Sequence, residues 1–193
     1  MVKIVLIRPG STDYDQQRRI QGTLDVPLNK EGSAEVAHLI DALRPLNLEA
    51  VYAPACQPAE ATGRAIAEAF DVKFRKLGRM QNLDHGLWQG LLIEEVRLKQ
   101  PKVYRQWQDR PHCTCPPGGE MLDQATERVR AAMAKLLKRH KDGVIGLVVP
   151  EPLASLVRCF LNQDALGDLW KASSEHGRWE VLEVQPETPA HSG

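Results

Sequence analysis

The chain has 193 residues, of which 42% are hydrophobic and 26% are charged, as is typical of a soluble globular protein. Its 25 Lys and Arg residues balance its 25 Asp and Glu residues, so no net charge attracts it to nucleic acid or to an anionic membrane. This length suits one domain with a sizeable core, and we expect a single domain over residues 1–184.

The apolar segments of the chain are short. The apolar start ends before Arg8, which is too short for a secretory signal peptide. No later segment reaches the roughly 20 apolar residues of a membrane-spanning helix. Four cysteines in a chain of this length do not indicate a disulfide framework. We therefore expect a cytoplasmic protein that contacts neither membrane nor nucleic acid.

Apolar periodicity and Pro or Gly boundaries predict alternating strands and helices along the chain. Strands are expected at 2–7, 48–52, 72–74, 143–149 and 179–184, and helices at 31–43, 58–70, 92–99, 101–108, 120–140 and 153–161. Residues 185–193 are polar with two prolines and are expected to form a disordered tail.

This alternation predicts an α/β domain, a three-layer α/β/α arrangement with a mostly parallel central sheet. Strands 2–7 and 143–149 are the most apolar and are expected side by side at its centre. Ligand sites of such sheets lie at the carboxyl ends of the strands. The positions to inspect are therefore Arg8-Pro9-Gly10 and Pro150-Glu151.

Six segments resemble, in order, the motifs of one known family. They are Leu6-Ile-Arg-Pro-Gly-Ser-Thr, Gln21-Gly-Thr-Leu-Asp-Val-Pro-Leu-Asn-Lys-Glu-Gly, Val51-Tyr-Ala-Pro-Ala-Cys-Gln-Pro-Ala-Glu-Ala-Thr, Gly86-Leu-Trp-Gln-Gly-Leu, Pro117-Gly-Gly-Glu-Met-Leu and Val148-Val-Pro-Glu. Together they cover about residues 2 to 184 and resemble the histidine phosphatase, or phosphoglycerate mutase-like, superfamily.

The resemblance implies a known set of catalytic positions. In that family a His attacks phosphorus, two Arg and a second His bind the phosphoryl oxygens, and a Glu protonates the leaving oxygen. The resemblance places the first Arg at Arg8, the nucleophile at Pro9, the second Arg at Pro58, the acid at Asn82 and the second His at Glu151, or at Pro150 in the neighbouring register. The signature's Glu and Asn fall on Ser11 and Asp15.

These replacements remove the chemistry of the family. Pro9 has no lone pair to offer phosphorus, so it cannot be a nucleophile in any protonation state. Asn82 cannot transfer a proton, and general acid catalysis contributes roughly 10²–10⁴ in rate. Glu151 replaces positive by negative charge where a phosphoryl group would bind. The sequence therefore predicts that no catalytic residue remains.

Other reactive side chains have simpler interpretations. We interpret His85 as a loop histidine that packs near Trp88, and Cys56 as a free buried thiol. The segment with His112, Cys113 and Cys115 has no second ligand cluster, so a plain loop is favoured over a metal site. Arg8 either holds loops at the strand ends or binds a ligand, and the sequence does not choose.

Three functions follow. The favoured one is a catalytically inactive pseudoenzyme with a binding or regulatory role, which no longer binds phosphate and acts through an exposed surface. The second is a divergent enzyme that uses Asp15, Asp84 or Glu151, with or without a divalent cation; the third is a metabolite sensor that uses Arg8. The candidate ligand pocket comprises Arg8, Ser11, Thr12, Asp15, Gln21, Asn82, Asp84, His85 and Glu151. We expect no cofactor and no metal, an unknown protein or small-molecule partner, and leave a homodimer open.

Overall fold

The computed structural model describes residues 1–163, 165–172 and 176–184, in which five strands form one sheet. The strands are β1 (Val2–Ile7), β2 (Ala50–Ala53), β3 (Lys73–Lys76), β4 (Gly143–Val148) and β5 (Trp179–Glu183), and their spatial order is β3-β2-β4-β1-β5. All neighbours are parallel except β5, which runs antiparallel to β1 at the edge. The mostly parallel sheet expected from the sequence is confirmed, and β1 and β4 are neighbours as expected. The expected central place of β1 is wrong, because β4 is the central strand and β1 lies beside the edge strand β5.

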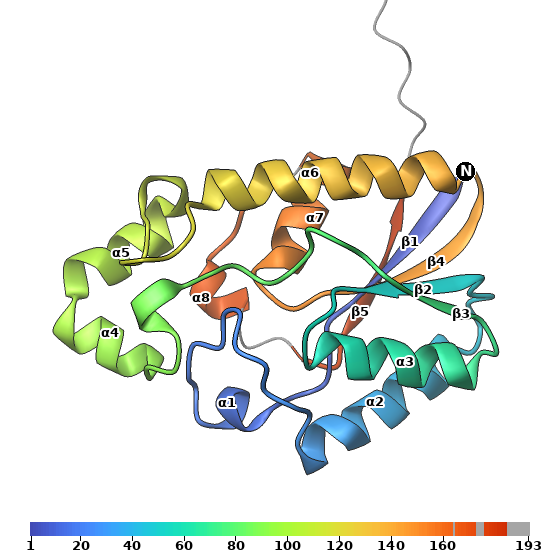
Figure 1. The fold of residues 1–193 in the computed structure, drawn as a ribbon, viewed down its shortest axis with the longest axis horizontal. Helices are drawn as coiled ribbons and strands as arrows, with labels where there is room; N and C mark the ends of the chain where they lie inside the picture. Colours follow the sequence, from blue (N-terminus) through green and yellow to red (C-terminus); the bar gives the residue numbers. More distant parts are fainter. Residues whose placement is uncertain (164, 173–175, 185–193) are drawn as a thin grey trace, which may run out of the picture.

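Helices cover both faces of this sheet, which confirms the three-layer arrangement (Figure 1). Helices α2 (Lys30–Leu43) and α3 (Ala59–Ala69) cover one face, and α6 (Leu122–Arg139) and α7 (Leu153–Asn162) cover the other. Alternation along β1 supplies both cores, because Ile4 and Leu6 join one apolar cluster whereas Val5 and Ile7 join the other. The sequence of a strand that is buried on both faces is a continuous apolar run, as in β1 from Ile4 onward.

The shorter helices lie beyond the carboxyl ends of the strands or in connections. They are α1 (Asp13–Gln16), α4 (Ile93–Lys99), α5 (Pro101–Asp109) and α8 (Leu169–Ala172), with single 3₁₀ turns at Gly86–Trp88 and Pro111–Cys113. No helix in the described residues is long and apolar enough to cross a bilayer. The expected tail 185–193 lies outside the described residues.

Most expected helices appear within one or two residues of their predicted bounds. Helix α6 begins later than expected because Glu120 lies outside it, and the Met121 N–H is instead capped by the Gln124 side chain. Helix α1 was not predicted, although Thr12 and Asp15 form a reciprocal capping box at its start. A helix of four residues is too short to show apolar periodicity, which explains why α1 and α8 escaped the sequence analysis.

The sheet register brings the two sequence-predicted site segments together. Ile7 is the parallel partner of Val148, so the chain leaves β1 and β4 at the same edge. The segment after β1 is held close to α2, because a Cβ on Gly32 would lie only 2.0 Å from the backbone oxygen of Ser11. The Arg8-Pro9-Gly10 segment therefore lies beside Glu151 in a fixed position.

A core substitution in β1 should test how strongly the sheet depends on this strand. Leu6 is fully buried, and Leu6→Ala should lower the free energy of unfolding by about 2–5 kcal/mol because it leaves a cavity. Leu98, which is 68% exposed, gives the control Leu98→Ala, whose effect should be far smaller. Urea unfolding followed by circular dichroism measures both, and equal losses would contradict the assignment of β1 to the core.

Candidate functional site

A cavity of about 230 Å³ lies at the carboxyl ends of β1 and β4. The loops after these strands contribute Pro9, Gly10 and Glu151 to its lining. Trp107 of α5 and Trp170 of α8 form an aromatic wall. This is the edge at which the sequence predicted a site.

Arg8 directly precedes the lining residue Pro9 and is bound to two carboxylates. Its Nε donates to Oε1 of Glu151 at 3.1 Å, and its Nη1 donates to Oε1 of Glu180 on β5 at 2.6 Å. The Arg8 and Glu151 side chains are each only 3% exposed. Burial disfavours the charged guanidinium, but the two carboxylates outweigh it and raise the pKa of Arg8 further. Arg8 is therefore a neutralised cation rather than a free one.

Glu151 is held from both sides. Its second carboxylate oxygen, Oε2, accepts from the backbone N–H and the hydroxyl of Ser155 at 3.0 and 2.7 Å, in the first turn of α7. The Asn82 side chain donates to the backbone oxygen of Glu151 at 3.2 Å. Both carboxylate oxygens are thus engaged, and the negative charge is fixed beside Arg8.

The backbone around the cavity offers few free donors. Pro9, Pro58, Pro150 and Pro152 all line it, and proline has no backbone N–H. The next two N–H groups after Pro9 are occupied, because Gly10 donates to the Thr62 hydroxyl at 3.2 Å and Ser11 donates to Glu35 at 2.7 Å. An anion placed beyond the end of β1 would therefore meet neither a cradle of backbone donors nor a free cation from that segment.

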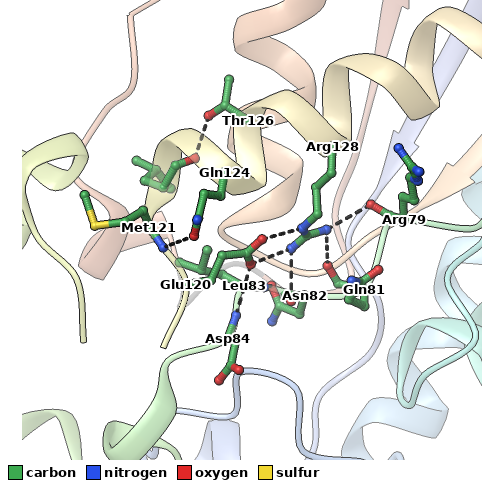
Figure 2. A network of polar contacts seen from close by, with 11 residues as sticks. Arg79, Gln81, Asn82, Leu83, Asp84, Glu120, Met121, Gln124, Thr126 and Arg128 are labelled. Carbon is green, nitrogen blue, oxygen red and sulfur yellow. Dashed lines mark hydrogen bonds and ion pairs between the residues drawn. The ribbon is translucent and has the colours of Figure 1, made fainter. Parts of the chain in front are cut away.

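An ion-pair network outside the cavity fixes the segment that carries Asn82 (Figure 2). The Glu120 carboxylate accepts from Arg128 Nε and Nη2 at 2.7 and 2.9 Å. Arg128 also donates to the backbone oxygens of residues 79, 81 and 82. The Asp84 N–H points to the Glu120 carboxylate. This network gives the Pro117-to-Glu120 motif a structural role that needs no catalysis.

His85 is buried in an aromatic cluster beside the cavity, close to where the sequence placed it. Its ring lies 6.5 Å from that of Trp88 and 5.4 Å from that of Trp107. Burial lowers the pKa of His85 to about 4, although the nearby charge of Asp84 acts in the opposite direction. Its Nδ1 has no hydrogen-bond partner in the described structure. A neutral ring with an unprotonated Nδ1 fits this environment, since an unpaired N–H costs more there than an unpaired lone pair.

The sequence-predicted pocket residues divide into two groups. Asp15, Gln21, Asn82, His85 and Glu151 line the cavity, whereas Arg8, Ser11, Thr12 and Asp84 are not among its described lining residues. The residues of the second group form hydrogen bonds with nearby protein groups instead. Ser11 binds Glu35, Thr12 caps α1, and Asp84 accepts from the Gly86 N–H at 2.8 Å.

Sequence reasoning missed several residues of the site. Glu180, the second partner of Arg8, was not considered, although a carboxylate within the short apolar strand 179–184 is a visible signal. The cavity lining also includes Arg18, Arg19 and His176, and His176 Nε2 lies 3.5 Å from Oδ1 of Asp15. These residues come from loops without periodicity, so no sequence pattern placed them here.

The other reactive side chains do not converge on the cavity. In residues 1–163, 165–172 and 176–184, no group of three or more His, Cys, Asp or Glu side chains is arranged to hold a metal ion. The His112 Nδ1 lies 2.6 Å from an Asp123 oxygen, and Cys113 and Cys115 are exposed free thiols. Cys56 is also free, but it is half-buried rather than fully buried as predicted, and its partial burial raises the pKa of the thiol.

The buried charges should be strongly interdependent. Arg8→Met should destabilise the protein by about 3–5 kcal/mol, because it leaves the buried Glu151 carboxylate without its cation. Adding Glu151→Gln should recover part of that loss. Arg97→Met is the control, since its pair with Glu94 is exposed and should be worth less than about 1 kcal/mol. Urea unfolding measures the wild type, Arg8→Met, Glu151→Gln, the double variant and the control; strictly additive losses for Arg8 and Glu151 would contradict the coupling.

Acid should destabilise the protein partly through His85. At pH 7 the imidazole is neutral in both the folded and the unfolded chain. Between pH 6.5 and 4 the unfolded chain binds a proton that the folded protein excludes, so stability falls as the pH falls. His85→Leu should reduce that fall by about 3 kcal/mol, whatever its effect at pH 7. The control is the exposed His38 in His38→Gln. An unchanged pH slope in His85→Leu would show that His85 is not excluded from protonation.

Comparison with known proteins supports the resemblance. The phosphoserine phosphatase 1 of Hydrogenobacter thermophilus is 29% identical over 185 residues, which cover 96% of this chain and 88% of that protein. Among solved structures, Bacillus stearothermophilus YhfR superposes with a TM-score of 0.83 at 23% identity, covering 96% of this chain and 92% of that one. A mycobacterial glucosyl-3-phosphoglycerate phosphatase solved with VO3 gives a TM-score of 0.79 at 22% identity, covering 94% of this chain and 92% of that one.

The structural neighbours show the same fold, and the family model extends the match to the sequence. The model of the histidine phosphatase superfamily (branch 1) matches residues 4–192, nearly the whole chain. The fold agrees with that match. This chain belongs to the histidine phosphatase superfamily, branch 1.

Proposed function

We propose that this chain is a pseudoenzyme of the superfamily, which does not transfer phosphoryl groups and has a binding or regulatory role. One observation carries the proposal. The guanidinium of Arg8, which the family resemblance assigns to phosphate binding, is bound by the carboxylates of Glu151 and Glu180. The phosphoryl site is thus filled by the protein's own anions.

The nucleophile is missing at the same place. Pro9 follows Arg8 directly and lines the cavity, and its ring nitrogen is part of an amide without a basic lone pair. The general acid is missing as well, since Asn82 uses its amide to donate to the Glu151 backbone and to accept from the Leu83 N–H. These two losses remove different groups that act on the same displacement at phosphorus, so neither compensates the other.

Electrostatics opposes the binding of a phosphate ester. A dianion near Arg8 would have to displace the carboxylates of Glu151 and Glu180 or accept their repulsion. Two unit charges of like sign about 4 Å apart repel by about 4 kcal/mol at an effective dielectric constant of about 20. Displacing Glu151 would also break its two bonds with Ser155. We therefore infer that no phosphate group binds beside Arg8, whereas Arg18 and Arg19 leave cationic groups elsewhere in the cavity lining.

Retained phosphatase chemistry is the second candidate, favoured by the names of the relatives. Both the phosphoserine phosphatase 1 and the glucosyl-3-phosphoglycerate phosphatase are named for hydrolysis of a phosphate ester. Such activity here would require a different nucleophile or base. The acids available, Asp15, Asp84 and Glu151, are each engaged in a local hydrogen bond or ion pair, which supports the non-catalytic proposal.

The third candidate, a metabolite sensor, needs Arg8 to receive the phosphate. Arg8 would have to exchange two carboxylate partners for a ligand at the base of a proline-lined cavity. The same contacts that disfavour catalysis disfavour this role. A regulatory role through a ligand of other chemistry is compatible with the structure.

A combined activity and binding experiment tests the proposal. The protein is incubated with phosphoserine, 3-phosphoglycerate and a generic aryl phosphate, and released phosphate and intact mass are measured. We expect neither turnover nor a phosphorylated protein. Calorimetry with phosphate and 3-phosphoglycerate should detect no binding by the wild type or by Pro9→His, because Pro58 and Glu151 still withhold or oppose the needed charge.

The matched control is Pro45→His, which introduces a histidine at an exposed proline outside the cavity lining. Turnover by the wild type that disappears in Arg8→Ala would show that the original pocket still works. Turnover that survives Arg8→Ala would establish a new mechanism. Phosphate binding by the wild type at millimolar or lower concentration would favour the sensor. Each of these outcomes would refute the proposal.

A further inference from the structure

A second hollow lies away from the cavity, at the amino ends of β2 and β3. Its volume is about 340 Å³, and its lining includes Tyr52, Lys73, Arg75, Arg139 and His140. None of these residues lines the first cavity. The strands β2 and β3 contribute one side, and the end of α6 contributes the other.

The sheet register creates this hollow. Ala50 pairs with Lys73, and Tyr52 pairs with Arg75, so all four side chains lie on the same face of the sheet. The small side chain of Ala50 leaves space beside the long side chains of the edge strand. Phe74 lies between the two cations in sequence and points to the opposite face, where Arg64 stacks over its ring at 4.7 Å.

The hollow gathers three cations that the protein does not neutralise. Lys73, Arg75 and Arg139 are exposed, and within the described part of the chain none of them forms an ion pair. By contrast, the neighbouring Lys76 is paired with Glu60 at 3.1 Å. These cations are therefore available to an external anion.

The negative charges near the hollow do not cancel this excess. Glu49 is the only carboxylate in the described lining, and its oxygens would lie 2.3 Å from a Cβ on Gly143, which places it against the start of β4. The carboxyl end of α6 contributes about half a negative charge. Lys138 also lies in this last turn and acts against that charge. The hollow remains positive even with these contributions.

A fixed polar pair adds neutral hydrogen-bonding capacity. The Tyr52 hydroxyl lies 2.8 Å from Nε2 of His140, and Tyr52 is only 2% exposed. The phenol and a neutral imidazole carry one proton donor each, and the bond between them uses one of the two. In either tautomer of His140, one donor of the pair is therefore not used within it.

We propose that this hollow binds a compact anion with several negative charges, of the pyrophosphate type. Arginine side chains suit phosphate oxygens because their donors form a planar fork, and a lysine adds a point charge. The concave shape and limited volume favour a small molecule over an extended polymer or a membrane, which would need a wider basic surface. The site is independent of the proposed loss of catalysis, since it shares no residue with the first cavity.

Calorimetry with sodium pyrophosphate on the full chain at low ionic strength tests the proposal. The wild type should bind, and Arg75→Gln and Arg139→Gln should each weaken the affinity about tenfold through the loss of a charge-assisted contact. Lys73→Gln should weaken it as well. Arg130→Gln on the exposed side of α6 and Lys102→Gln on α5 are matched controls that remove the same charges elsewhere, and both should leave the affinity unchanged.

Four results would overturn the proposal. One is an absence of pyrophosphate binding. Another is equal weakening by the control variants, which would indicate non-specific attraction to the surface. A further such result is that the wild type binds duplex DNA or vesicles with anionic lipid but not pyrophosphate, and that Arg75→Gln and Arg139→Gln abolish this binding. Citrate, a multivalent carboxylate, serves as a comparison; tighter binding of citrate than of pyrophosphate would refute the phosphate preference.

Discussion

The contact of Arg8 with Glu151 and Glu180 is the interaction on which the candidate site depends. Arg8 follows β1, Glu151 follows β4, and Glu180 belongs to β5, so one guanidinium joins three parts of the sheet. A buried charge is costly unless it is paired and hydrogen-bonded. Since each group here depends on the others, the position of Glu151 also fixes the start of α7 through Ser155. The contacts that neutralise Arg8 therefore also set the position of Glu151, which lines the cavity.

The surrounding scaffold is stabilised by contacts that require no ligand. Glu120 and Arg128 tie the segment containing Asn82 to α6, and Glu35 ties Ser11 to α2. These contacts fix the loops around the cavity without any contribution from a ligand. Selection for fold stability alone preserves such residues, because a buried or half-buried ion pair that loses one partner destabilises the protein. These contacts stabilise the fold independently of any reaction at the cavity.

The sequence predicted those features that arise from local pattern. Apolar periodicity located β1, β4 and the long helices, and the rule that parallel strands end at one edge placed Arg8 beside Glu151. Glu180 could not be placed in the same way, because its position follows from an antiparallel edge strand whose pairing depends on the whole chain path. Trp107 and Trp170 lie 63 residues apart in sequence, and only tertiary packing makes them neighbours, with ring centroids 6.3 Å apart. The capping box at Thr12 was visible in the sequence but marks too short a helix to be recognised by periodicity.

The sheet partners of β1, among them β5, lie far along the chain from it, which delays the pairing of β1 during synthesis. During synthesis on the ribosome β1 emerges before both of its neighbours in the sheet, β4 and β5. Until then the apolar strand has neither of its backbone partners, and Arg8 has neither of its carboxylates. An unpaired apolar strand is a site of aggregation in an incomplete chain. The nascent protein therefore carries β1 uncovered until β4 and β5 have been made, and any chaperone that protects it would have to act on the segment that becomes β1.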